Sequence, residues 1–193
     1  WVPASGAFRA GTVTGTHWDS ANIGTNSFAA GYNATATGAY SISMGYKTEA
    51  VSGDGAVALG YQTKAVNYGD FAGGGNTVAS GFYATAFGQG SVASGTRSFA
   101  VGEGNEAYGD YSIAMGRNSI ASGQDAFVLG VSAIASGDTA FAIGNSADAT
   151  ATGSMAFGAN ANANGLESIS FGNNMVVSGP YSFGINVSST AAG

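Results

Sequence analysis

The segment Ser98-Phe99-Ala100-Val101-Gly102 recurs fourteen residues later as Ser112-Ile113-Ala114-Met115-Gly116, and Ala140-Phe141-Ala142-Ile143-Gly144 is a third version. Each copy alternates small with large apolar residues and ends on glycine. Alternation with a period of two is typical of a β-strand whose two faces differ. A glycine at about every seventh residue argues against helix, because each costs a helix about 1 kcal/mol. The sequence therefore predicts short strands in tandem repeat.

Aligning the chain on its glycines extends the pattern to twelve units of fourteen residues over 24–192, with Ser52 as a single insertion. Position 8 of the unit is Gly in eleven units and position 1 in ten. Gly and Asn adopt positive φ most readily, so positions 1 and 8 are expected to form two tight corners per coil. The units begin at Gly24, Gly38, Gly53, Asn67, Gly81, Gly95, Gly109, Gly123, Gly137, Ala151, Gly165 and Gly179.

The two strands of such a coil must face each other across a thin interior. Positions 4, 6, 11 and 13 are mostly Ala, Ser or Thr and fit inside, whereas the large residues at positions 5 and 7 must point outward. The expected fold is an all-β, parallel β-roll solenoid of about twelve 14-residue coils over residues 24–193.

Large residues that point outward would form a continuous apolar stripe, which soluble monomers rarely expose. Copies of the chain around a parallel axis would cover it, although spacing alone does not distinguish a trimer from a dimer or from another apolar partner. The expected interface residues are Phe28, Ile42, Met44, Val57, Leu59, Phe71, Phe87, Phe99, Val101, Ile113, Met115, Phe127, Leu129, Phe141, Ile143, Met155, Phe157, Ile169, Phe171, Phe183 and Ile185.

Composition narrows the class of protein. The 193 residues include 33 Gly but only 8% charged residues, with a net charge of −6. Collagen is excluded because no Gly-X-Y period is present, and disorder is disfavoured by 45% hydrophobic content. Five Lys and Arg against eleven Asp and Glu argue against nucleic-acid binding. No apolar run approaches the ~18 residues of a membrane span, so no membrane insertion by this chain is expected.

The inventory of reactive side chains argues against an enzyme. His17 is the only histidine, and there is no Cys to form a disulfide or a thiolate metal site. Asp54, Asp110 and Asp138 share position 2, but the GGxGxD pattern of calcium-binding rolls is missing, so they are interpreted as solvated corner residues. No catalytic residue, metal or cofactor is expected.

Residues 1–23 fit the repeat poorly and carry both tryptophans, Trp1 and Trp18. The end of a solenoid must be covered or its strand edges stay open, so this segment is interpreted as an N-terminal cap. A ligand-binding tip built on the two tryptophans is the alternative. The chain opens without a starting Met and is interpreted as a piece of a longer protein.

Residues that share a position in adjacent coils should lie side by side. Glu49 and Lys64 are expected to pair, and Tyr32, Tyr46 and Tyr61 to stack as a ladder. A column at position 12 is the candidate docking surface for a ligand, with ordinary β-propensity as the alternative reading. It consists of Val78, Val92, Ile120 and Ile134 and is interrupted by Glu106.

The three quoted pentads resemble the S-V-A-I-G signature of trimeric autotransporter adhesin heads of the YadA type, and Ser119, Ala121 and Gly123 complete that fourteen-residue unit. The resemblance covers 24–192. It implies a left-handed roll, a parallel homotrimer, and display from a bacterial outer membrane through a stalk and anchor outside this chain. It also implies binding to host matrix proteins, cells or surfaces. The last unit departs from the signature, because Gly184 and Asn186 replace Ala and Gly.

Three functions remain open at this point. The first is adhesion by a multivalent trimer. The second is a structural spacer or a phage-type fibre segment with no ligand of its own. The third, binding to ice or crystal surfaces, needs outward threonine columns, whereas Thr48, Thr63 and Thr77 occupy position 11, which is expected to be interior.

Overall fold

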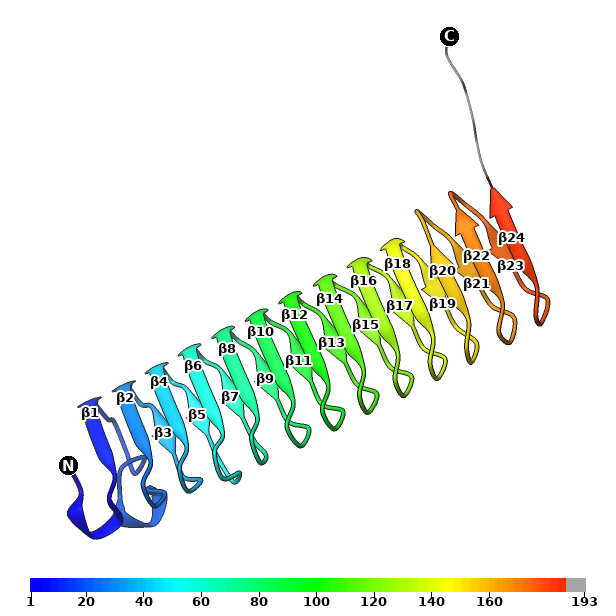
Figure 1. Cartoon of the computed structure of the whole chain (residues 1–193). Helices are drawn as coiled ribbons and strands as arrows, with labels where there is room; N and C mark the ends of the chain where they lie inside the picture. Colours follow the sequence, from blue (N-terminus) through cyan, green and yellow to red (C-terminus); the bar gives the residue numbers. More distant parts are fainter. Residues whose placement is uncertain (187–193) are drawn as a thin grey trace. The chain divides into compact units, whose positions relative to one another are not determined.

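The computed structural model describes residues 1–186, and the chain falls into two compact units, Trp1–Gly104 and Asn105–Gly193. In both units the strands wind into successive coils, as Figure 1 shows. Each unit is a parallel β-solenoid with a spacing of about fourteen residues, and the chain has about eleven turns in all. The all-β parallel solenoid is thus confirmed. The second half of the twelfth predicted coil lies outside the described residues.

Each coil from β2 to β23 contributes one long and one short strand, whereas β1 is followed by η2. The first unit comprises η1 (Pro3–Ser5), β1 (Phe8–Thr12), η2 (Ser20–Asn22), β2 (Phe28–Tyr32), β3 (Thr35–Ala36), β4 (Ile42–Tyr46), β5 (Glu49–Ala50), β6 (Val57–Tyr61), β7 (Lys64–Ala65), β8 (Phe71–Gly75), β9 (Val78–Ala79), β10 (Thr85–Gln89), β11 (Val92–Ala93) and β12 (Phe99–Glu103). The second comprises β13 (Glu106–Ala107), β14 (Ile113–Arg117), β15 (Ile120–Ala121), β16 (Phe127–Val131), β17 (Ile134–Ala135), β18 (Phe141–Asn145), β19 (Asp148–Ala149), β20 (Met155–Phe157), β21 (Asn162–Ala163), β22 (Ile169–Gly172), β23 (Val176–Val177) and β24 (Phe183–Asn186).

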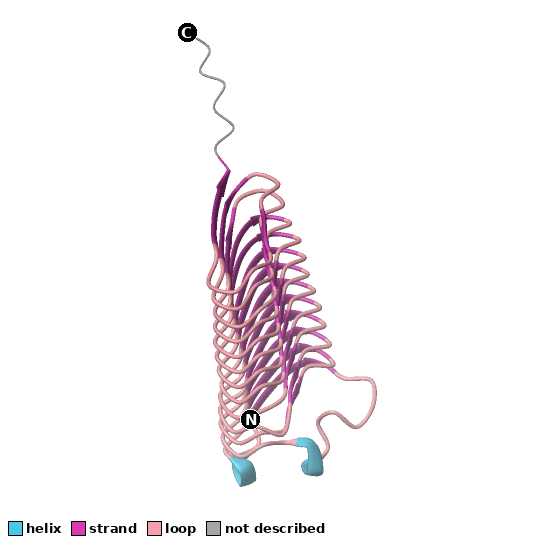
Figure 2. Ribbon diagram, turned by 90° about the vertical axis from the view of Figure 1, so that its right-hand side faces the viewer, coloured by secondary structure: helices cyan, strands magenta, loops and turns pink. Residues whose placement is uncertain are grey.

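Long strands stack on long strands and short strands on short ones. In the first unit the orders are β1-β2-β4-β6-β8-β10-β12 and β3-β5-β7-β9-β11. In the second they are β14-β16-β18-β20-β22-β24 and β13-β15-β17-β19-β21-β23. Figure 2 shows the two kinds of strand on opposite sides of the coils. Pairing is parallel and keeps the repeat in register, as in Phe127↔Phe141, so each position of the unit forms a column.

Small side chains fill the interior of the coils, as the sequence predicts. The described residues at positions 6 and 13 are all buried, 18 of the 23 being Ala, and positions 4 and 11 are buried with few exceptions. Several serine hydroxyls at position 4 donate inward to carbonyls of the same coil, as in Ser41 Oγ to Gly38 O at 2.6 Å, whereas Ser98 Oγ and Ser112 Oγ are buried without a hydrogen-bond partner. The interior accepts little volume.

The two glycine positions have different causes. At position 8, ten of the eleven glycines have positive φ, for example +120° at Gly60, which confirms that expectation. At position 1 the expectation of positive φ is wrong. Gly81 and Gly123 lie outside the left-handed region and are glycine because a Cβ would collide with the backbone of the next coil, at Gly95 and Gly137 respectively.

Left-handed backbone occurs instead at positions 3 and 10, mostly in residues other than glycine. Tyr83 at position 3 has a φ of 59° and Lys47 at position 10 has a φ of 51°. Their N–H groups donate to the preceding coil, Tyr83 N to Tyr68 O at 2.8 Å and Lys47 N to Tyr32 O at 2.7 Å. This ladder of hydrogen bonds holds the corners, so residues with side chains adopt a conformation that normally favours Gly or Asn.

Asp70 is the one carboxylate in the described part of the interior, and its side chain is fully buried. Its Oδ2 accepts from Asn67 N at 2.8 Å and its Oδ1 from Ala84 N at 2.9 Å. Desolvation raises the pKa of Asp70, and the backbone hydrogen bonds counter only part of that effect. Asp70 stands at position 4, where the other units have Ser or Ala. Its unit is also one of the two that begin with a residue other than Gly, here Asn67.

Two adjacent glycines differ in whether the structure requires glycine: Gly74 is constrained and Gly75 is not. Gly74 has a φ of +108° and a Cβ there would strike Gly88, so Gly74→Ala is expected to lower the free energy of unfolding by about 3 kcal/mol or more. Gly75→Ala is the matched control, because Gly75 has φ outside the left-handed region and nothing within 4 Å of its Cβ. That variant should leave stability unchanged or raise it by up to about 1 kcal/mol in urea unfolding. Equal losses from the two changes would contradict this account.

The buried carboxylate makes stability depend on pH. The pKa of Asp70 is raised in the folded state, so the folded protein binds the proton more tightly and loses stability as pH rises above the unfolded pKa of about 3.9. Asp70→Ser restores the common residue at this position and removes the pH-dependent loss of stability that the buried carboxylate causes. As pH rises from about 4 to 7, we expect the difference in unfolding free energy, Asp70→Ser protein minus parent, to increase. Parallel pH profiles would show that burial does not perturb this group.

Candidate functional site

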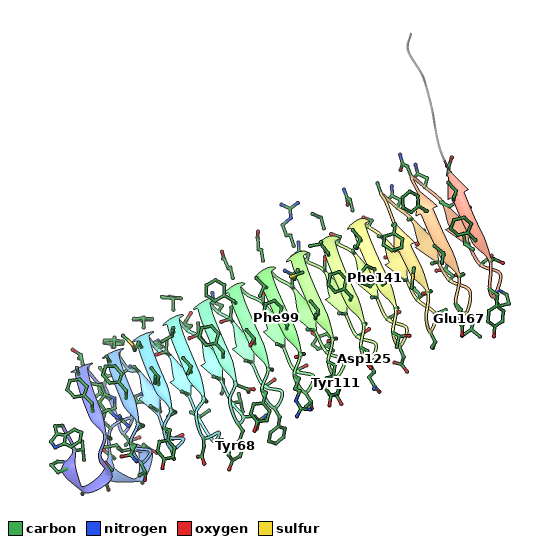
Figure 3. The ribbon with its side chains drawn as sticks, viewed as in Figure 1. Tyr68, Phe99, Tyr111, Asp125, Phe141 and Glu167 are labelled. Carbon is green, nitrogen blue, oxygen red and sulfur yellow. The ribbon has the colours of Figure 1, made fainter. Side chains whose placement is uncertain are left out.

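The outward face of the long strands carries the large residues at positions 5 and 7. Figure 3 shows Phe99 and Phe141 on this face, outside their own coils. In the first unit Ile42, Met44, Phe87 and Phe99 are exposed, and Phe28, Val57, Leu59, Phe71 and Val101 are half-buried. In the second unit Leu129, Met155, Phe171, Phe183 and Ile185 are exposed, and Ile113, Met115, Phe127, Phe141, Ile143, Phe157 and Ile169 are half-buried.

Aromatic rings on this face contact one another from coil to coil. In the second unit the rings of Phe127 and Phe141 stack with centroids 4.4 Å apart, and Phe157 lies 5.7 Å from Phe141. In the first unit Phe71 and Phe87 stack at 6.4 Å across Gly73, whose missing side chain leaves room for the Phe87 ring. Such contacts shield only part of each ring, and the rest of the face stays apolar and open.

The outward face of the short strands carries the position 12 column. Val78 and Val92 pair in the first unit and Ile120 and Ile134 in the second, and all four are half-buried. Glu106 pairs with Ile120, so a carboxylate adjoins the apolar pair in the second unit. The structure places each pair together. Its role as a docking surface stays a prediction.

The two side-chain contacts predicted from column position are confirmed. Lys64 Nζ lies 3.0 Å from Glu49 Oε2, and both side chains are partly exposed. Tyr32, Tyr46 and Tyr61 stack with ring centroids 5.2 and 5.0 Å apart. An exposed ion pair of this kind contributes about 0.2–1 kcal/mol, so it supports register more than it holds the fold.

The N-terminal segment adds a strand that the sequence reading missed. β1 pairs in parallel with β2, with Phe8 opposite Phe28 and Arg9 opposite Ala29. Arg9 therefore occupies an interior position, where its guanidinium donates to Ser27 O at 3.1 Å and to Ala36 O at 3.0 Å. Burial lowers the pKa of Arg9. The match of Phe8-Arg9-Ala10-Gly11 to Phe28-Ala29-Ala30-Gly31 is the signal that could have revealed this strand.

The two tryptophans do not form one site. Trp1 is 71% exposed, whereas Trp18 is half-buried and its Nε1 donates to Ala34 O at 2.8 Å. Trp18 lines an apolar pocket of about 420 Å³ together with Val2, Ala4, Ser5, Ser20 and Ile23. Trp1 is not among the residues that line it.

A second, polar pocket of about 290 Å³ is lined by His17, Asn33, Lys47 and Glu49. His17 Nδ1 lies 3.1 Å from Thr35 Oγ1, and Asn33 Oδ1 accepts from Thr14 N at 2.8 Å. Within residues 1–186 the Thr35 hydroxyl is the side-chain group that hydrogen-bonds to this imidazole. Within the same range no three His, Cys, Asp or Glu side chains gather as metal ligands.

Corner aromatics are a further feature that sequence reasoning overlooked. Tyr68 and Phe82, both at position 2, stack at 6.3 Å, and Arg97 lies over the ring of Tyr83 at 5.9 Å. Figure 3 shows Tyr68 among the loops at the ends of the long strands. In the second unit, Tyr111, Asp125 and Glu167 are likewise at these loops. No helix in the described part of the chain is both long and apolar enough to cross a membrane.

Comparison with known families identifies the repeat. The YadA head domain repeat matches residues 23–48, 52–77, 72–98, 79–104, 93–119, 121–147 and 149–174, which together cover well over half of the chain. No curated protein matches the chain. Members of this family are surface-exposed autotransporter adhesins of a non-enzymatic type. By its fourteen-residue coils and by this match, the chain belongs to the YadA head family.

Proposed function

We propose that this chain is the head of a surface-displayed trimeric adhesin that attaches to host matrix proteins, cells or surfaces. The observation that carries the proposal is the outward apolar face of the long strands. At about 1.5–3 kcal/mol for each large side chain that becomes fully buried, covering this face strongly favours self-association. A parallel homotrimer of left-handed rolls, in which the 21 residues named above form the interface, covers it symmetrically.

Residues 1–23 are proposed to cap the roll of residues 24–193. The Arg9 guanidinium lies at the start of the coils and supports this role. It donates to the carbonyl oxygens of Ser27 and Ala36, which have no preceding regular coil beside them. In such a head, the position 12 column, Trp1 and Trp18 remain candidate ligand contacts. The outer-membrane anchor, in this proposal, belongs to other parts of the protein.

The structure disfavours ice binding. Thr48, Thr63 and Thr77 are fully buried and cannot form an outward threonine surface. A spacer without a ligand shares the proposed trimer and differs only in attachment. Catalysis and cofactor binding form no part of the proposal.

The oligomeric state tests the interface. We expect light scattering after size exclusion to give about three times the 18.9 kDa chain mass. Phe127→Asp combined with Phe141→Asp should yield monomers, because burying unpaired carboxylates costs about 3–5 kcal/mol each. Ser136→Asp, at an exposed position of the same unit, is the control and should remain trimeric. A stable wild-type monomer would overturn the interface.

Attachment tests the adhesin against the spacer. Beads that carry the head are expected to adhere to wells coated with collagen, fibronectin or laminin, or to epithelial cells. The Phe127→Asp, Phe141→Asp protein, at equal mass on the beads, should adhere at least about tenfold less, since it loses avidity. Trimeric beads that adhere to none of these surfaces would favour the spacer.

A further inference from the structure

The tyrosine ladder at position 9 ends in an open ring face. Tyr32, Tyr46 and Tyr61 stand in register at the ends of β2, β4 and β6, with interplanar angles of 9° and 8°. The exposed fraction is 37% and 38% for the first two rings and rises to 51% for Tyr61. Tyr61 is the last ring of the stack, so one of its faces has no ring against it.

The next rung is Gly75, which the fold does not require to be glycine. Register places Gly75 between Tyr61 of β6 and Gln89 of β10. Its φ lies outside the left-handed region, and no atom lies within 4 Å of a Cβ built there. The glycine just before it, Gly74, meets both kinds of constraint. Neither backbone conformation nor crowding accounts for Gly75, and its effect is to leave one rung of the ladder empty.

The empty rung has the thickness of a single ring. Adjacent strands lie about 4.8 Å apart, so Tyr61 and Gln89, two strands apart, are separated by about 9.6 Å along the stack. A ring placed midway would sit about 4.8 Å from each. That distance matches the 5.0 Å between the rings of Tyr46 and Tyr61, so an occupant would continue the ladder without displacing a side chain.

Three neutral amides occupy positions 9 and 10 of the coils that flank the slot. Positions 9 and 10 of these three coils hold Tyr61 and Gln62, then Gly75 and Asn76, then Gln89 and Gly90. Gln62, Asn76 and Gln89 are exposed, and each amide offers both donors and an acceptor. Lys64, also in the first of these coils, is paired with Glu49. The slot thus combines one aromatic face with amide side chains, and the next side chain of the column beyond Gln89 is the exposed carboxylate of Glu103.

We propose that the slot between Tyr61 and Gln89, with Gly75 as its floor, binds a neutral saccharide ring. The apolar C–H face of a pyranose packs on an aromatic face, and its hydroxyls bond to amide side chains. An aromatic side chain of a partner protein fits the same thickness but leaves the three amides without partners. The inference rests on the proposed adhesin function, since it names the ligand class.

Saturation-transfer NMR on the purified full chain tests the slot. The probes are the methyl glycosides of galactose, glucose, N-acetylglucosamine and N-acetylgalactosamine, with p-cresol as a mimic of a tyrosine side chain. We expect at least one glycoside to bind, with a Kd of about millimolar for the single ring. Gly75→Tyr fills the rung and Tyr61→Ser removes the platform, and each should weaken binding by at least about tenfold.

Ala159→Tyr is the matched control, because it adds an exposed tyrosine at position 9 of the other unit and should change binding by less than about twofold. Thermal unfolding of each variant verifies that it is folded. Three results would overturn the inference: no glycoside binds, Gly75→Tyr binds as well as the parent, or p-cresol binds while the glycosides do not. If beads adhere to matrix or cells while no glycoside binds, the saccharide site is refuted and the adhesin proposal is not.

Discussion

The thinness of the coil interior is the constraint on which the structure depends. Two strands of one fourteen-residue coil face each other so closely that Ala, Ser and Thr fill the space between them. Ala100, Ala114 and Ala142 are fully buried, while neighbours such as Phe99, Ile113 and Phe141 have nowhere to go but outward. A globular domain hides its large apolar residues in its own core. This chain cannot, so the same pattern that builds the coil also builds a surface that favours association.

Departures from the small interior are accommodated by local partners. Asn105, fully buried at position 11, donates to Gly116 O at 2.7 Å and accepts from Ser119 N at 3.0 Å. Asp70 accepts two backbone N–H groups. Val128 is the largest fully buried side chain and carries no polar atom that needs a partner. The partners of Asn105 lie in the next coil and those of Asp70 in its own coil and the next, whereas the buried Thr63 Oγ1 has no hydrogen-bond partner.

Much of the fold follows from the sequence because residues at equal positions of successive units stack in register. Once the period is known, parallel in-register stacking brings residues of equal position together, and the Glu49–Lys64 pair and the tyrosine ladder follow without further information. The backbone at the corners does not follow. Positions 3 and 10 adopt left-handed φ with residues as different as Tyr83, Arg97 and Glu167, because inter-coil hydrogen bonds impose the conformation there. Position 10 is Asn or Gly in seven of its eleven described units, whereas no residue type marks position 3.

The candidate site was harder to predict for the same reason. Positions under steric constraint repeat and are readable, whereas position 9, at the end of the long strands, varies along the chain. Column 9 runs Tyr, Tyr, Tyr, Gly, Gln and Glu in the first unit, then Arg, Val, Asn, Ala and Asn in the second. Arg9 escaped notice because the connection of residues 13–23 is six residues longer than in a regular coil and breaks the fourteen-residue interval, although its pentad fits the unit. In a scaffold that specifies itself through Ala and Gly, recognition must reside in the side chains that the repeat leaves unspecified. The informative residues are then the ones that break a column without any structural need, and Gly75 is such a residue.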